Sequence, residues 1–198
     1  MSFQLILASE SPRRAALLAQ AGITPDVVLP AAIDESVTKG ELPRIHAMRL
    51  ATEKARKVQS EWPSRSKDDK PAFILAADTV VALGRRILPK AADDDEVRAC
   101  LTLLSGRRHQ VITAVALIAP DGKLRRRVAL TRVLLLRLSE AQMSQYIESR
   151  EGVGKAGGYA IQGCAEMLVK EIAGSYSNVV GLPLALTVAL LEGCGYGR

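Results

Sequence analysis

Two arginines stand where a helix is expected to begin, and their position points to an anion site. Residues 5–23, LILASESPRRAALLAQAGI, open with a short apolar run and continue with Ser11-Pro12, a favourable helix start. Arg13-Arg14 would lie in the first turn, where the helix dipole disfavours cations. Free backbone N–H groups, two guanidinium groups and the hydroxyls of Ser9 and Ser11 could together bind a phosphate or carboxylate. The alternative is a pair of exposed surface arginines.

A single carboxylate interrupts the most apolar segment of the chain. Asp78 lies within AFILAADTVVAL, residues 72–83, which is expected to be a buried strand. Burying a carboxylate costs much free energy unless the group is hydrogen-bonded, ion-paired or bound to a metal. Because perturbed carboxylates concentrate at functional sites, Asp78 is a candidate for chemistry. The alternative is a buried Asp that caps a local turn.

Three more polar residues are candidates for ligand contacts. Glu35 belongs to a carboxylate pair that follows a short strand expected over 26–29, and suits a metal, a substrate hydroxyl or a solvated loop. Lys54 lies on a helix expected over 42–58, near its apolar side, and reaches either a cleft or the surface. Gln162 carries a paired donor and acceptor that suit a nucleobase edge, or it is an ordinary loop amide.

The rest of the chain must supply the elements that position these residues. Other expected features are helices over 93–104, 139–149 and 183–191, hairpin strands over 111–118 and 127–138, a loop over 63–71, and a polar turn over 174–182 that leads into a strand. GVGKAG, residues 152–157, matches a dinucleotide-binding fingerprint. It follows an expected helix and leads into an extended segment at 159–163, so we reject a Rossmann interpretation. His109 is expected to support a strand or act as a general base.

The composition excludes several classes of protein. The 198 residues are 48% hydrophobic, enough to bury a core as one domain or two small lobes. A net charge of +6 permits a polyanionic ligand, but aromatic residues at 4% argue against a stacking platform for single-stranded nucleic acid. The sequence has no 18-residue apolar segment, no signal-peptide pattern and no paired cysteine motif. We therefore expect a cytoplasmic protein without membrane or nucleic-acid partners.

Seven segments, in this order, resemble the Maf family of nucleoside triphosphate pyrophosphatases. The segments are LASESPRR (7–14), IDES (33–36), KA (54–55), AADTVV (76–81), LSGRRHQV (104–111), GKAGGYAIQG (154–163) and GSYSNVVGLPL (174–184). The resemblance covers nearly the whole chain. It implies an α/β, two-lobed mixed-sheet fold of the inosine-triphosphatase-like type, with residues 1–198 as a single domain around a central cleft. It also implies a homodimer.

The resemblance further implies hydrolysis of a nucleoside triphosphate to the monophosphate and pyrophosphate with a divalent cation, Mg²⁺ or Mn²⁺. The catalytic acid/base of the family falls on Asp78, and the metal would lie at Asp78 and Glu35. The positions that contact substrate fall on Ser9, Arg13, Arg14, Glu35, Lys54, Thr79, Lys90 and Gln162. In the family, Arg13, Thr79 and Gln162 mark enzymes acting on dTTP and UTP, with modified pyrimidine nucleotides as further candidates. The group acting on 7-methyl-GTP carries Trp and Glu at the first and third positions.

Two other functions stay open at this point. The family is also linked to inhibition of septum formation, so the chain could be a nucleotide-binding regulator of cell division with little or no catalysis. Intact Asp78 and the four basic positions argue against a protein that only binds. Nucleic-acid binding would rest on the basic surplus alone, without aromatic residues or a recognisable motif.

Overall fold

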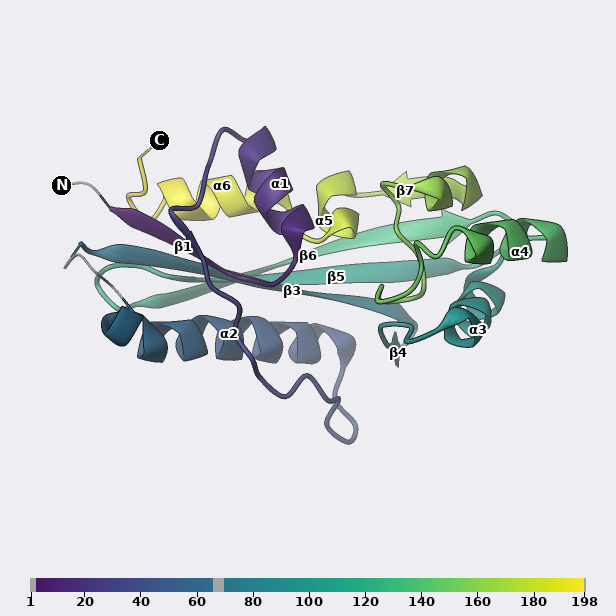
Figure 1. Ribbon diagram of the computed structural model, residues 1–198, viewed down its shortest axis with the longest axis horizontal. Helices are drawn as coiled ribbons and strands as arrows, with labels where there is room; N and C mark the ends of the chain where they lie inside the picture. Colours follow the sequence, from purple (N-terminus) through teal and green to yellow (C-terminus); the bar gives the residue numbers. More distant parts are fainter. Residues whose placement is uncertain (1–2, 66–69, 198) are drawn as a thin grey trace.

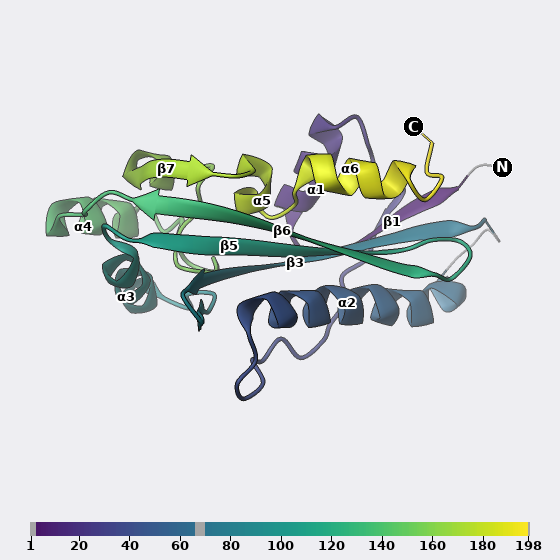
Figure 2. The same cartoon turned by 180° about the vertical axis from the view of Figure 1, so that it is seen from behind.

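The computed structural model describes residues 3–65 and 70–197, and in it helices cover both faces of one mixed sheet (Figure 1, Figure 2). The strands are β1 (Gln4–Ala8), β2 (Val27–Val28), β3 (Ala72–Leu83), β4 (Arg86–Leu88), β5 (Arg108–Ile118), β6 (Leu124–Leu135) and β7 (Val169–Ala173). Their order is β2-β1-β3-β5-β6-β7, with β4 paired to β3. β1 is parallel to β2 and β3, and the other pairs are antiparallel.

Helix α2 covers one face of the sheet, and helices α1 and α6 cover the other (Figure 1). The helices are α1 (Pro12–Gln20), α2 (Pro43–Arg65), α3 (Asp94–Leu104), α4 (Glu140–Glu148), α5 (Tyr176–Val180) and α6 (Leu184–Glu192), with a short 3-10 helix at Cys164–Leu168. The small residues Ala47, Ala51 and Ala55 recur every fourth position, so they share one side of α2 and pack closely on the sheet. Among the described residues, no helix combines the length and apolar character needed to cross a bilayer.

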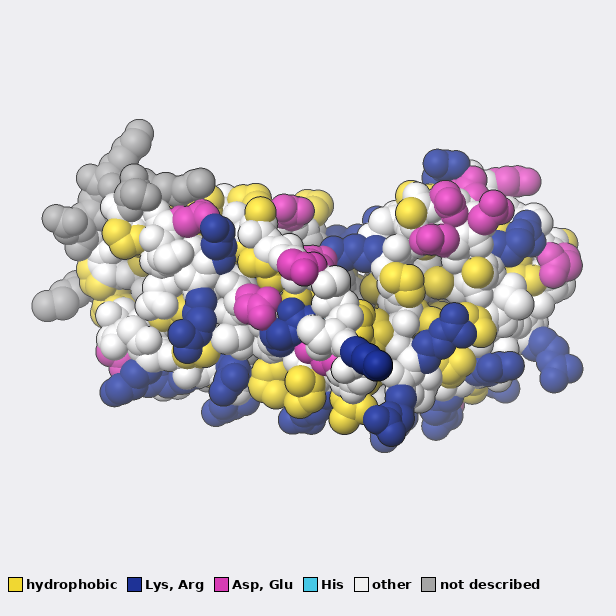
Figure 3. All heavy atoms as spheres, turned by 90° about the horizontal axis from the view of Figure 1, so that it is seen from below, with side chains coloured by type: hydrophobic (Ala, Val, Ile, Leu, Met, Phe, Trp, Pro, Cys, Tyr) yellow, Lys and Arg dark blue, Asp and Glu magenta, His cyan; other side chains and the backbone are white. Residues whose placement is uncertain are grey.

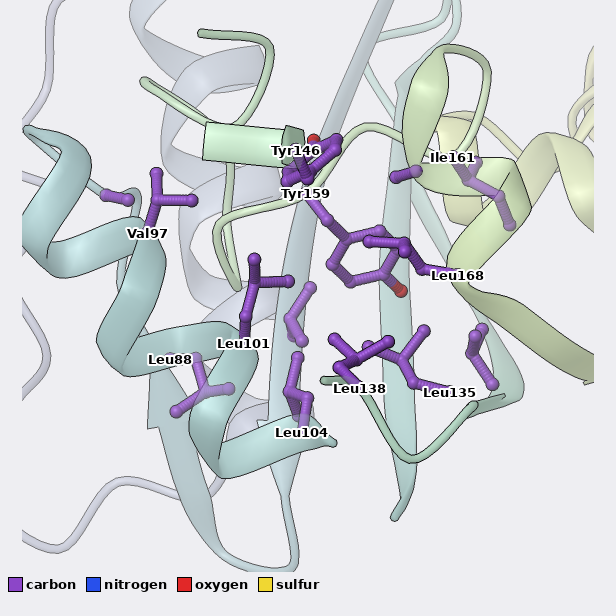
Figure 4. Packing of buried hydrophobic residues seen from close by; sticks show 14 of the residues in the cluster. Leu88, Val97, Leu101, Leu104, Leu135, Leu138, Tyr146, Tyr159, Ile161 and Leu168 are labelled. Carbon is purple, nitrogen blue, oxygen red and sulfur yellow. The ribbon is translucent and has the colours of Figure 1, made fainter. Parts of the chain in front are cut away.

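One apolar cluster lies between α2 and the sheet, and a second apolar cluster lies toward the opposite end of the long strands. Leu101 and Leu104 of α3 pack with Tyr146 of α4 and with Leu135 of β6 (Figure 4). Tyr159 belongs to the same cluster, although its segment also borders the cleft described below. The two ends of the sheet therefore have separate cores, joined by the long strands β3, β5 and β6.

A gap in the edge of the sheet separates these two ends. β1 pairs with β3 only as far as Ala76, and β4 pairs with β3 from Val81 onward. Within the described chain, residues 77–80 are therefore paired on one side only, to β5. Because side chains alternate along a strand, Asp78 lies on the α2 face and Thr79 on the opposite face.

Most expected elements form, and the differences have local causes. α2 runs to Arg65 instead of ending near residue 58, with Pro63 inside it; residues 66–69 of the expected loop lie outside the described part. The segment 159–163 was expected to be extended, which is wrong: turns replace a strand there. The strand expected after residues 174–182 is also wrong, since α5 lies inside that segment and α6 follows. The strand β7 comes before it.

Candidate active site

A cleft opens at the gap in the sheet edge and contains every residue predicted for the site. It is lined by Ala8–Arg14, Ala31, Glu35, Lys54, Asp78, Thr79, Val81, Lys90, Gly154–Ala156, Tyr159–Gln162 and Val179–Gly181. The space-filling view shows the surface hollowed between two parts of the molecule, with Lys and Arg side chains in the hollow (Figure 3). The structure thus brings together segments that are far apart in the sequence, on a site rich in positive charge.

The half of the cleft on the α2 face is an ion network around one lysine. The Lys54 ammonium lies 2.7 Å from Asp78 Oδ1 and 2.6 Å from Glu35 Oε1. Asp78 and Lys54 are each only 7% exposed, so the surface interpretation of Lys54 is wrong. Lys90 Nζ lies 2.6 Å from the other oxygen of Glu35, at the exposed side of the network. The buried carboxylate in β3 is therefore compensated by an ion pair, as its position requires.

Glu35 joins both lysines, and this changes its acidity. Partial burial raises the pKa of Glu35, but hydrogen bonds and charge from Lys54 and Lys90 outweigh it and lower the pKa to about 2. Glu35 is therefore ionised at neutral pH. The neighbouring Asp34 instead accepts hydrogen bonds from the backbone N–H and hydroxyl of Ser36. Of the carboxylate pair seen in the sequence, only Glu35 lines the cleft.

The other half of the cleft is organised around Arg14, which is buried rather than a surface residue. Its Nε donates to the Gly181 carbonyl at 2.9 Å, Nη1 donates to Ser9 Oγ at 3.0 Å, and Nη2 donates to Thr79 Oγ1 at 3.4 Å. Burial lowers the pKa of Arg14, while the charge of Asp78 raises it. Ser11 makes no side-chain cap for α1; instead, Ser9 Oγ accepts from the Ser11 N–H.

The glycine-rich loop of residues 154–157 completes the cleft wall by pairing with the segment that carries Lys90. Lys90 and Ala156 form an antiparallel bridge, and the backbone of Ala91 bonds to both Gly154 and Lys155. Lys155 lines the cleft, and burial together with the charge of Arg13 lowers its pKa. Arg13 and Lys155 both carry positive charge and both line the cleft, so this part of the cleft favours binding of an anion.

His109 supports the cleft from behind. It is 1% exposed, and its Nε2 lies 2.7 Å from the hydroxyl of Tyr159, a cleft residue. This arrangement matches the supporting role that the sequence suggested for His109, and not a general base, since His109 does not line the cleft.

We expect this histidine to make the protein sensitive to acid. Burial lowers the pKa of His109 from 6.5 to about 4, so the folded protein binds fewer protons than the unfolded chain between these values. Stability therefore falls as the pH drops through this window, by about 3 kcal/mol in free energy of unfolding. His109→Gln keeps a hydrogen-bonding group and does not titrate, so its stability should depend less on pH. Urea denaturation at several pH values between 7 and 4 gives the free energy of unfolding of both proteins. If this free energy fell equally with pH in both, the role of His109 would be contradicted.

The two carboxylates of the site are oxygen donors of the kind that suits a divalent cation. Within the described residues, no group of three or more His, Cys, Asp or Glu side chains gathers to hold a metal. Asp78 and Glu35 nevertheless contact the same ammonium. Mg²⁺ is commonly bound by one or two carboxylates together with waters and substrate phosphates. Asp78 and Glu35 are two carboxylates of this kind.

The mixed sheet with helices on both faces is an α/β architecture that is also found among solved structures. A HAM1 protein from Coxiella burnetii, 15% identical, shares it with a TM-score of 0.51 over 96% of this chain and all of that one. The predicted fold class is confirmed. The profile of the Maf family, described as Maf-like protein, matches residues 4–194, and this chain belongs to that family.

Two relatives extend this result over nearly full length. A dTTP/UTP pyrophosphatase from Paramagnetospirillum magneticum is 56% identical, with 97% of each chain covered. A dTTP/UTP pyrophosphatase from Caulobacter vibrioides is 55% identical, with 97% of this chain and 96% of the relative covered. Family membership, predicted from seven segments, is confirmed by both.

Some parts of the cleft carried little signal in the sequence. The Gly181 carbonyl, which anchors Arg14, is a backbone group, so no side chain in segment 174–184 indicates its role. At Gly181 φ is +133°, a conformation that residues with a side chain rarely adopt. Thr113, which lies behind the cleft and contacts Thr79, is a threonine within an apolar strand, and its residue type alone gives no sign of function.

Proposed function

We propose that this chain hydrolyses dTTP and UTP to the nucleoside monophosphate and pyrophosphate. The observation that carries the proposal is Asp78, a buried carboxylate held by Lys54 at the floor of a cationic cleft. The names of the 55–56% identical relatives support the choice of substrates. Arg13, Thr79 and Gln162, the three positions tied to pyrimidine substrates, all line the cleft.

In this proposal the residues of the cleft divide the chemistry between them. Lys54 holds Asp78 Oδ1, so we assign Asp78 Oδ2 to the attacking water. The water oxygen bonds to the α-phosphorus, its proton passes to Asp78, and the bond to the bridging oxygen breaks, releasing pyrophosphate. Developing negative charge on the phosphates is offset by the fixed cations Arg13, Arg14, Lys54 and Lys90. Ser9 orients Arg14, and Gln162 would contact the base.

Asp78 and Glu35 would hold the divalent cation, Mg²⁺ or Mn²⁺, which when bound supplies further neutralisation of the triphosphate. The homodimer, the cytoplasmic location and a single domain over residues 1–198 stay predictions.

Pyrophosphate release from a panel of nucleotides tests the proposal. The panel comprises dTTP, UTP, CTP, 7-methyl-GTP, ITP and modified pyrimidine triphosphates, each with Mg²⁺, Mn²⁺ or EDTA. We expect metal-dependent release from dTTP and UTP at least tenfold faster than from 7-methyl-GTP. Release mainly from 7-methyl-GTP would contradict the specificity. Binding of dTTP without release would instead favour the regulator of cell division.

A further inference from the structure

A buried chain of hydrogen bonds runs from Arg14 into the interior of the sheet. Thr79 Oγ1 lies 2.9 Å from Thr113 Oγ1, and Thr113 Oγ1 donates to the backbone carbonyl of Asn178 at 3.2 Å. Thr113 on β5 and Asn178 on α5 have no exposed surface. Neither residue lines the cleft, so neither can touch the substrate. Thr113 is nevertheless connected to Arg14 through Thr79, and Asn178 is connected to Thr113 through its backbone carbonyl.

The number of protons on the two threonine hydroxyls fixes which group donates in each of these hydrogen bonds. Each threonine hydroxyl has one proton, and that of Thr113 is used on the Asn178 carbonyl. Thr113 must then accept from Thr79, which leaves the Thr79 oxygen to accept from Arg14 Nη2. With its proton on Thr113, Thr79 does not donate to the Gly181 carbonyl 3.3 Å away, which accepts from Arg14 Nε at 2.9 Å.

The far end of the chain is anchored in the sheet. Asn178 Nδ2 donates to the Val111 carbonyl and to Thr131 Oγ1, both at 3.0 Å. Thr131 Oγ1 also accepts from the Ser175 N–H, just before α5. These bonds fasten α5 to strands β5 and β6, and α5 leads directly into Gly181. The carbonyl that holds Arg14 is therefore placed by the interior of the protein.

We propose that Thr113 is a positioning residue for Arg14, acting through Thr79 and through α5. The inference rests on the proposed function of the cleft. Without the Thr113 hydroxyl, the Thr79 hydroxyl turns its proton to the Gly181 carbonyl, and the lone pair that accepts from Arg14 Nη2 turns with it. The Asn178 carbonyl also loses its donor, which weakens the hold on α5. Both changes misdirect the guanidinium group that binds the triphosphate.

Thr113→Val tests this role, because valine has nearly the same shape and lacks the hydroxyl. We expect KM for dTTP to rise about tenfold or more, with kcat changed less, since a binding group is misplaced. Thr113→Ser restores the hydroxyl and should return KM to near the wild-type value. A purely structural role would lower the folded fraction, which reduces apparent kcat and leaves KM unchanged.

Thr187→Val is the matched control. Thr187 is also fully buried, but its hydroxyl donates to the carbonyl of Pro183, the N-cap residue of α6, and is not part of the series of bonds that leads to Arg14. This variant should lose stability without a change in KM. A folded Thr113→Val protein with wild-type KM, or a KM that Thr113→Ser fails to restore, would overturn the proposal.

The dissociation constant of dTTP, measured by calorimetry on the same proteins, separates this proposal from the proposed function. If the wild type binds dTTP without hydrolysing it, the proposed function fails, but weaker binding by Thr113→Val that Thr113→Ser restores still supports the positioning role. A wild-type protein that neither binds nor hydrolyses dTTP would overturn both.

Discussion

Asp78→Asn is expected to reduce pyrophosphate release from dTTP by about 10²–10⁴-fold, the range typical for loss of a general base. The asparagine keeps the size of the side chain and can still accept a hydrogen bond from Lys54 through its oxygen. It cannot take a proton from the attacking water, and it is a poorer ligand for a divalent cation. The fold should persist because Lys54 remains paired with Glu35 at 2.6 Å. Single-turnover rates, with circular dichroism and thermal melting, measure both effects.

Asp34→Asn is the matched control, because it removes a carboxylate one residue from Glu35 and outside the cleft lining. Its hydrogen bonds are local, to Ser36, so activity should stay close to wild type. Substantial turnover by well-folded Asp78→Asn protein would sink the assignment of Asp78 as the base. Equal losses in both variants would show that charge near the cleft matters and the base does not.

Lys54→Met should damage both stability and activity. Methionine fills similar space, but the change leaves Asp78 and Glu35 facing each other without the ammonium that joins them. Removing one partner of a buried ion pair costs about 3–5 kcal/mol of unfolding free energy, and we expect a loss of about this size. Activity should fall by about 10²-fold or more because a cation for the triphosphate is lost as well.

Lys57→Met, less than one turn further along α2, provides the comparison. Lys57 is half exposed and pairs with Glu61 at 3.1 Å. An exposed ion pair of this kind contributes less than about 1 kcal/mol to the free energy of unfolding. Urea denaturation should show little change for Lys57→Met, and dTTP turnover should be unaffected. Lys54→Arg keeps the charge but not the compact ammonium that fits between two carboxylates, so we expect it not to restore activity. Wild-type stability of Lys54→Met would contradict the central role of Lys54.

The strongest predictions from the sequence came from conflicts between a residue and its surroundings. A carboxylate inside an apolar strand and two cations at a helix start each opposed a local rule, and Asp78 and Arg14 both line the cleft. Lys54 posed no such conflict, because a lysine beside the apolar side of a helix is ordinary. Its partner Asp78 comes from a different element, and only tertiary structure brings them together. The resemblance to the family, not local chemistry, placed Lys54 in the site.

Other features had no basis in local sequence. Arg14 and Gly181 are separated by 167 positions, and a backbone carbonyl has no residue type that announces it. The segment 159–163 was expected to be extended, because its apolar residues resemble a strand. Tyr159 and Ile161 are instead buried in the second core, and the Ala160 N–H donates a hydrogen bond to the Tyr146 hydroxyl at 3.0 Å. Packing from distant helices decided the conformation of this segment.

The gap at residues 77–80 of β3 also bears on how such an enzyme can change over evolutionary time. Asp78 and Thr79 are neighbours in sequence, yet they act on opposite faces of the sheet, one with Lys54 and the other with Arg14 and Thr113. Substitutions on the Thr79 face can therefore change the contacts to a ligand there, while Asp78 and Lys54 keep their surroundings on the other face. A lineage can acquire a new preference for substrate without first losing its reaction.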